Sequence, residues 1–104
     1  MNKYQKITGA RTLLGLPERA TIEEIKSNYR RLMSKWHPDH CTGDAEQCRE
    51  MAQKLSSAYA TIMDYCNHYQ YSFAEDEVKN YLSPDEWWHD RFENDFIWSN
   101  DKKI

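Results

Sequence analysis

A histidine and an aspartate flank one proline at His37, Pro38 and Asp39, and these are the residues of the chain best suited to chemistry. An imidazole and a carboxylate can exchange a proton or form charge-assisted hydrogen bonds with a partner. An enzyme also needs a nucleophile, oxyanion donors and a pocket, and the sequence offers no obvious set of these groups. We therefore interpret the tripeptide as a binding element, and we expect neither an enzyme nor a cofactor.

A basic amphipathic helix is predicted directly before the tripeptide. Thr21 and Glu24 form a capping box that starts it, and Pro38 stops it at Trp36 or His37. Apolar residues recur at spacings of three and four and predict one buried stripe, formed by Ile22, Ile25, Tyr29, Leu32 and Trp36. Four basic residues fall outside this stripe, on the flanks and the solvent face: Lys26, Arg30, Arg31 and Lys35.

A second long helix is predicted after the tripeptide, from about Ala45 to His68. Its apolar stripe contains Cys48, Met51, Leu55, Ala58, Tyr59, Ile62, Cys66 and Tyr69. Two long helices joined by a short loop pack antiparallel, which would place the tripeptide at the tip of the pair. A short helix over Gly9 to Leu14 is expected before them, with Thr8 as its N-cap and Gly15 just beyond its end.

The composition indicates a small all-α protein with opposite charges in its two halves. The chain has 104 residues, and residues 1–54 hold 10 Lys/Arg and 7 Asp/Glu, against 4 and 10 in residues 55–104. Three cysteines at unrelated spacings argue against a disulfide framework and favour a reducing compartment. Because no apolar run approaches the length of a membrane span or signal peptide, we expect a cytoplasmic protein with no membrane partner.

The last third of the chain is acidic and rich in tryptophan. A weak helical pattern covers Ala74 to Leu82, and Ser83 and Pro84 are typical of the start of another helix. We expect residues 74–104 to form a helical extension of a domain that covers residues 5–73. Its aromatic residues would pack on that domain, on a second copy of the chain or on one further protein: Trp87, Trp88, Phe92, Phe96 and Trp98.

The tripeptide, in register with both stripes, resembles the J domain of DnaJ-type co-chaperones. The resemblance covers residues 10–66. The matching residues are Leu13-Leu14-Gly15-Leu16, Ile25-Lys26, Tyr29-Arg30-Arg31-Leu32, Lys35-Trp36-His37-Pro38-Asp39, Leu55, Ala58-Tyr59 and Ile62. The family's Gly/Phe-rich linker, Cys-x-x-Cys zinc region and client-binding β domain have no counterpart in this sequence, which therefore resembles a minimal J protein.

The resemblance implies an antiparallel helix pair with short flanking helices. It also implies a partner, because J domains dock on the ATPase domain of DnaK-type heat-shock chaperones and trigger ATP hydrolysis there. On this interpretation Lys26, Arg30, Arg31 and Lys35 dock, while His37, Pro38 and Asp39 deliver the trigger. Asp39 would accept bonds from the partner, and a ring N–H of His37 would hold the loop.

Three alternatives remain open from the sequence. His37, His40, Cys41 and Cys48 are a possible zinc ligand set, although their spacing fits no common zinc finger. The basic helix could bind nucleic acid, but the acidic second half argues against it. The chain could also be a degenerate J domain that serves as a scaffold, since His40 and Ala10-Arg11 depart from the family pattern.

Overall fold

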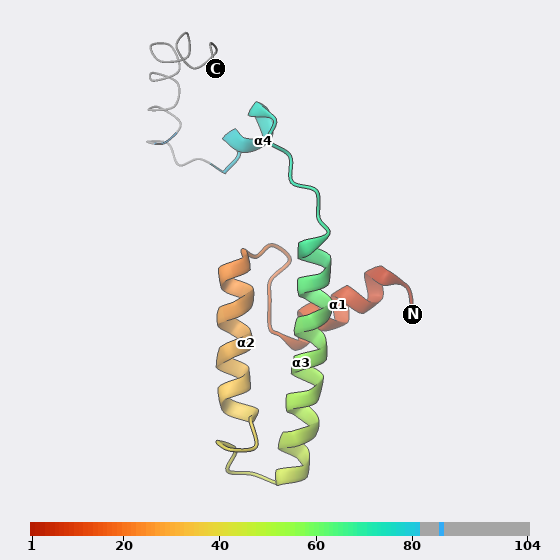
Figure 1. Cartoon of the computed structure of the whole chain (residues 1–104), viewed down its shortest axis with the longest axis vertical. Coiled ribbons are helices and arrows are strands. Elements are labelled where there is room, and N and C mark those ends of the chain that lie inside the picture. The colour runs from red at the N-terminus through yellow and green to blue at the C-terminus, as the bar shows by residue number, and fades with distance from the viewer. Residues whose placement is uncertain (82–85, 87–104) are drawn as a thin grey trace. The chain divides into compact units, whose positions relative to one another are not determined.

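The computed structural model describes residues 1–81 and residue 86, and these form helices without any strand. The helices are α1 (Lys3–Leu13), α2 (Ile22–Trp36), α3 (Ala45–Asn67) and α4 (Glu75–Lys79) (Figure 1). The chain divides into two compact units, Met1–Tyr69 and Gln70–Ile104. The all-α prediction is confirmed, and α1, α2 and α3 build the first unit.

Both ends of α2 follow from its sequence, as predicted. Thr21 caps the helix reciprocally: its Oγ1 accepts from the Glu24 N–H at 3.1 Å, and the Glu24 carboxylate accepts from the Thr21 N–H at 3.2 Å. At the other end the backbone of His37 is extended, with φ −60° and ψ 136°, as expected for the residue before a proline. The helix therefore ends at Trp36, directly before the tripeptide.

The predicted start of α1 at Thr8 is wrong. Asn2 is the N-cap: its Oδ1 accepts from the Gln5 N–H at 2.8 Å, while the Gln5 side chain accepts from the Asn2 N–H at 3.2 Å. Thr8 lies inside the helix, where its carbonyl accepts a bond from the Thr12 hydroxyl at 2.9 Å. The predicted end is confirmed, because Gly15 follows the helix with φ +67°, a conformation that suits glycine at this position.

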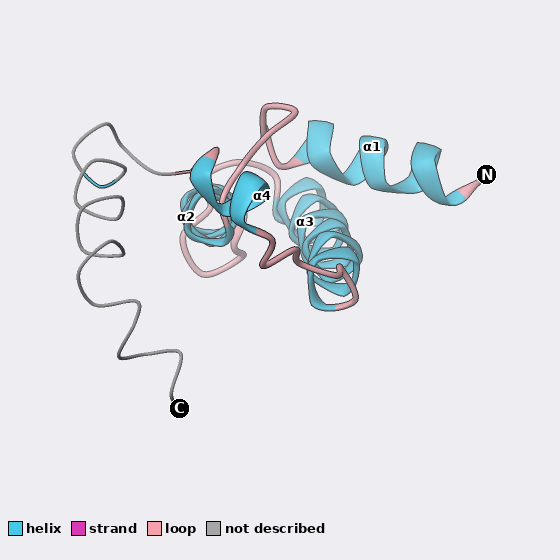
Figure 2. Ribbon diagram, turned by 90° about the horizontal axis from the view of Figure 1, so that it is seen from above, coloured by secondary structure: helices cyan, strands magenta, loops and turns pink. Residues whose placement is uncertain are grey.

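The core of the first unit forms where α3 lies between α1 and α2. Figures 1 and 2 show α2 antiparallel to α3, and α1 crossing α3 on its other side. Leu14 and Leu55 are almost fully buried, and the remaining members of the buried cluster are Ala10, Leu16, Ile25, Ala58 and Ile62. Tyr29 of α2 stacks on Tyr59 of α3 with ring centroids 4.1 Å apart. The helix pair predicted from the two stripes is confirmed, except that Tyr69 of the second stripe lies beyond the end of α3 and is 52% exposed.

Polar contacts fix the segment between α1 and α2. The Asn28 amide donates to the carbonyls of Leu14 and Gly15, each at 3.2 Å. Arg11 donates to the Leu16 carbonyl at 2.7 Å. The Asn28 bonds join the end of α1 to the middle of α2, and the Arg11 bond holds the segment between the two helices.

Helix α4 belongs to the second unit and falls within the predicted helical pattern of residues 74–82. The predicted helix start at Ser83 and the aromatic residues from Trp87 to Trp98 lie outside the described residues. Within the part of the chain that is described, no helix has the length and apolar character that crossing a bilayer requires.

Candidate functional site: the His-Pro-Asp loop

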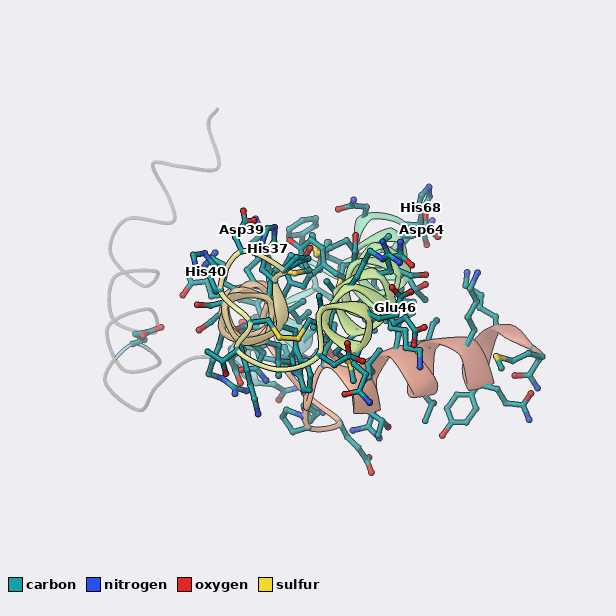
Figure 3. All side chains as sticks on the ribbon, turned by 90° about the horizontal axis from the view of Figure 1, so that it is seen from below. His37, Asp39, His40, Glu46, Asp64 and His68 are labelled. Atoms are coloured by element: carbon teal, nitrogen blue, oxygen red, sulfur yellow. A yellow bond between two sulfur atoms is a disulfide. The ribbon has the colours of Figure 1, made fainter. Side chains whose placement is uncertain are left out.

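The tripeptide forms a tight turn that connects α2 to the segment leading into α3 (Figure 3). The His37 N–H donates to the Met33 carbonyl at 2.8 Å and closes the last turn of α2. The His37 carbonyl then accepts from the backbone N–H groups of both His40 and Cys41, each at 2.9 Å. Pro38 occupies the second position of this turn, where its fixed φ is favourable. The turn is therefore closed by its own backbone.

The imidazole of His37 is bonded within the loop. Its Nδ1 accepts a hydrogen bond from the Asp39 N–H at 3.1 Å. Accepting requires an unprotonated Nδ1, so the ring hydrogen of the neutral form is on Nε2. The prediction that a ring N–H holds the loop is wrong in direction, because the ring contacts the loop as an acceptor.

The Asp39 carboxylate also lies near this ring, with Oδ2 3.7 Å from Nδ1 of His37. An ion pair at this distance requires a protonated ring, whereas the hydrogen bond requires an unprotonated Nδ1, so the two interactions exclude each other. We favour the hydrogen bond because it is shorter and because an exposed ion pair contributes little. The Asp39 side chain is 81% exposed and the His37 side chain 45%, so the carboxylate remains accessible to a partner.

The four basic residues of α2 are all exposed, and none of them forms an ion pair with another described residue. At 100° per residue, Lys26 and Arg30 share one flank of the helix, while Arg31 and Lys35 share the opposite flank. Lys35 also places Nζ 5.4 Å from the centroid of the Trp36 ring. By this helix geometry the four basic residues fall on two flanks of α2.

A disulfide joins Cys41 to Cys48, across a Cα–Cα distance of 6.3 Å. The prediction from cysteine spacing, which disfavoured a disulfide framework, is therefore wrong for this pair. Cys41 follows the tripeptide turn and Cys48 lies in the first turns of α3, where it is 1% exposed. The apolar stripe of α3 predicts the burial of Cys48, but a separation of seven residues matches no familiar motif and does not indicate its partner.

The disulfide also bears on the zinc alternative. Two of its four proposed ligands, Cys41 and Cys48, are bonded to each other. The rings of His37 and His40 lie 5.9 Å apart, centroid to centroid. Among the residues that the structure describes, no three His, Cys, Asp or Glu side chains are grouped as a metal site would require. Within the described part of the chain, these four residues are therefore not arranged as a zinc site.

Asp44 completes the loop and was not singled out from the sequence. It caps α3 by accepting from the Glu46 N–H at 3.3 Å, and Glu46 pairs with Arg49 at 2.6 Å one turn further on. Figure 3 shows Glu46 on α3, across the loop from the labelled tripeptide residues. The loop is thus bounded by a proline stop on one side and an aspartate cap on the other.

Comparison with known proteins finds sequence similarity to DnaJ chaperones over about half of this chain. The chain is 42% identical over 52 residues to "Chaperone protein DnaJ 2" of Aquifex aeolicus, covering 50% of this chain and 13% of that protein. It is 47% identical over 53 residues to "Chaperone protein DnaJ" of Chlamydia trachomatis, covering 51% of this chain and again 13% of the relative. The chain thus spans only a small part of these relatives.

No solved structure shows a significant match to this chain. The model of the DnaJ domain family matches residues 12–72, which is more than half of the chain and includes α2, the tripeptide loop and α3. The chain therefore belongs to the DnaJ domain family.

Proposed function

We propose that the protein is a co-chaperone that binds the ATPase domain of a DnaK-type chaperone and stimulates its ATP hydrolysis. The observation that carries this proposal is the exposed Asp39 carboxylate, held on a closed turn at the end of a basic helix in a member of the DnaJ domain family. The hydrolytic chemistry belongs to the partner, and this chain supplies binding energy.

The tripeptide residues have different tasks in this proposal. Asp39 contacts the partner, because its carboxylate can accept charge-assisted hydrogen bonds from an arginine or from backbone N–H groups. Pro38 restricts the backbone from which that carboxylate projects. His37 positions Asp39, since its ring accepts from the Asp39 N–H at 3.1 Å. A loop that is ordered before binding loses less conformational entropy on docking.

The basic residues of α2 provide docking and steering. Lys26, Arg30, Arg31 and Lys35 are exposed and form no ion pairs within the described part of the chain, so their charges can act on an acidic surface. Such charges mainly raise the association rate and make binding dependent on salt. Specificity then comes from the tripeptide, which must reach its own site at the same time.

The acidic C-terminal third has a separate role in this proposal. We assign residues 74–104 to an extension that contacts either the J domain of the same chain or one further protein through Trp87, Trp88, Phe92 and Trp98, on sequence grounds. The double substitution of Trp87 and Trp88 by alanine distinguishes the two. A contact within the chain predicts a lower melting midpoint, whereas a contact with another protein predicts an unchanged one.

Binding to a DnaK-type chaperone tests the proposal directly. The full chain, labelled with a fluorophore, is titrated with the ATP-bound chaperone, and the Asp39→Asn variant serves as the matched control. Saturable binding that is weakened by this variant supports the proposal. Binding that is unaffected by Asp39→Asn contradicts the role of the tripeptide, and binding only to RNA, abolished by salt, would favour nucleic-acid binding.

A further inference from the structure

The disulfide is connected directly to the tripeptide turn. The backbone N–H of Cys41 donates to the His37 carbonyl at 2.9 Å, so the residue that carries one sulfur also closes the turn. The other sulfur belongs to Cys48, which is 1% exposed and bonded through its N–H to the Asp44 carbonyl at 3.0 Å. The bridge therefore ties the turn to the buried beginning of α3.

Apart from the bridge, this part of the loop is secured mainly by Asp44, which caps the start of α3. Thr42, Gly43 and Asp44 are exposed, and the Gly43 N–H donates to the Cys41 sulfur itself at 3.3 Å. Reduction would open the covalent ring of residues 41–48 and leave the turn held to α3 only through the chain. Because a cross-link restricts the conformations available to the segment it closes, its loss increases the freedom of the loop.

The two sulfurs differ in their exposure to an attacking thiolate. Cys41 is partly exposed, whereas Cys48 is buried, so a reductant meets the Cys41 sulfur first. A dithiol attacks there through its thiolate, forms a mixed disulfide and displaces the Cys48 sulfur, which takes up a proton. The second thiol of the reductant then releases Cys41. The reductant becomes a cyclic disulfide and two hydrogen atoms pass to the protein.

We propose that the Cys41–Cys48 disulfide is a redox switch that orders the tripeptide loop when it is closed and releases the loop when a dithiol reduces it. This inference rests on the proposed function for its consequence: the closed form should stimulate the chaperone at lower concentration than the open form. The bridge would restrict the conformations of the loop, and a loop that is ordered before binding loses less conformational entropy when it docks on the chaperone.

The test compares oxidised and dithiothreitol-reduced full chain by two measurements. The first is backbone hydrogen exchange at His40 and Cys41, which needs no chaperone. The second is stimulation of ATP hydrolysis as a function of concentration. Cys41→Ser is the matched variant, because it lacks the bridge under both conditions and leaves the buried Cys48 in place. Cys66→Ser controls for the cysteine outside the bridge.

We expect reduction to speed exchange at His40 and Cys41 by about tenfold and to raise the half-maximal concentration by about three- to tenfold. Cys41→Ser should match the reduced form with or without dithiothreitol, and Cys66→Ser should behave as the unmodified chain. Equal exchange in both forms, or stronger stimulation by the reduced form, overturns the switch. If neither form stimulates, the proposed function fails, and the exchange rates alone then decide the switch.

Discussion

The backbone N–H of Asp39 donates a hydrogen bond to Nδ1 of His37 at 3.1 Å. This bond fixes the direction in which the Asp39 backbone leaves the turn, while the Asp39 carboxylate remains 81% exposed. His37 therefore holds the backbone of Asp39 in place, while the Asp39 carboxylate remains accessible to a partner.

Replacing His37 by phenylalanine should loosen the loop without unfolding the domain. Phenylalanine keeps a planar ring but lacks the acceptor for the Asp39 N–H, so that amide should exchange faster with solvent. Because His37 lies at the surface, loss of this hydrogen bond should lower the free energy of unfolding by only about 0.5–1 kcal/mol. Hydrogen exchange and urea unfolding check both statements. An unchanged Asp39 exchange rate would show that the ring does not hold the loop.

The two basic flanks of α2 should contribute unequally to docking. A partner can face one flank more closely than the other, so reversing Arg30 to glutamate and reversing Arg31 to glutamate should have different effects. The more damaging change should weaken binding to the chaperone most at low ionic strength, and 0.5 M salt should reduce the difference. Titrations at two salt concentrations measure this. Equal, salt-independent losses would contradict electrostatic docking through one flank.

Thiol titration should find one cysteine thiol in the native oxidised chain, because Cys41 and Cys48 are joined to each other and Cys66 is the third cysteine. Burial raises the pKa of the Cys66 thiol, so its thiolate fraction at neutral pH is lower than that of an exposed cysteine.

Alkylation of Cys66 should therefore be slow at neutral pH and accelerate as the pH rises toward the raised pKa. The same shift makes the fold slightly less stable above the ordinary thiol pKa, where the unfolded chain ionises first. Mass spectrometry after timed alkylation provides the measurement. Three rapidly modified cysteines in the native chain would contradict the disulfide.

Leu55 should be among the most sensitive positions of the core. It is 1% exposed on α3, between α1 and α2, and Leu55→Ala would leave a cavity at the centre of the three helices. The expected loss is about 2–5 kcal/mol of unfolding free energy. Urea unfolding followed by circular dichroism checks it, with Ser56→Ala at an exposed neighbouring position as the control. A loss below about 1 kcal/mol would contradict this packing.

Much of the fold could be predicted because strong local signals coincide with long periodic stripes. Thr21 and Glu24 start α2 and Pro38 stops it, because a capping box favours a helix start and a proline cannot continue a helix. The start of α1 was missed although Asn2 and Gln5 form a capping box, because the helix beyond them has a weak apolar period and Thr8 offered a competing cap.

The sequence predicted where the candidate site lies in the chain, but it did not predict the contacts within the site. The sequence located His37 and Asp39 in a loop, but whether the ring donates or accepts depends on backbone angles that no local pattern specifies. The pairing of Cys41 with Cys48 depends on how the loop returns to α3, which is a tertiary property. Cysteine spacing alone therefore could not reveal it.

Single-turnover ATP hydrolysis by a DnaK-type chaperone, with and without this protein, tests the central claim most directly. Asp39→Asn is the control, because it replaces the carboxylate by a neutral amide of similar shape and retains the backbone N–H that binds His37. Its stability should lie within about 0.5 kcal/mol of the parent. We predict that the unmodified chain accelerates hydrolysis and that Asp39→Asn, equally folded by circular dichroism, does not. Equal acceleration by both proteins, or none by the folded parent chain, would contradict a function carried by the tripeptide.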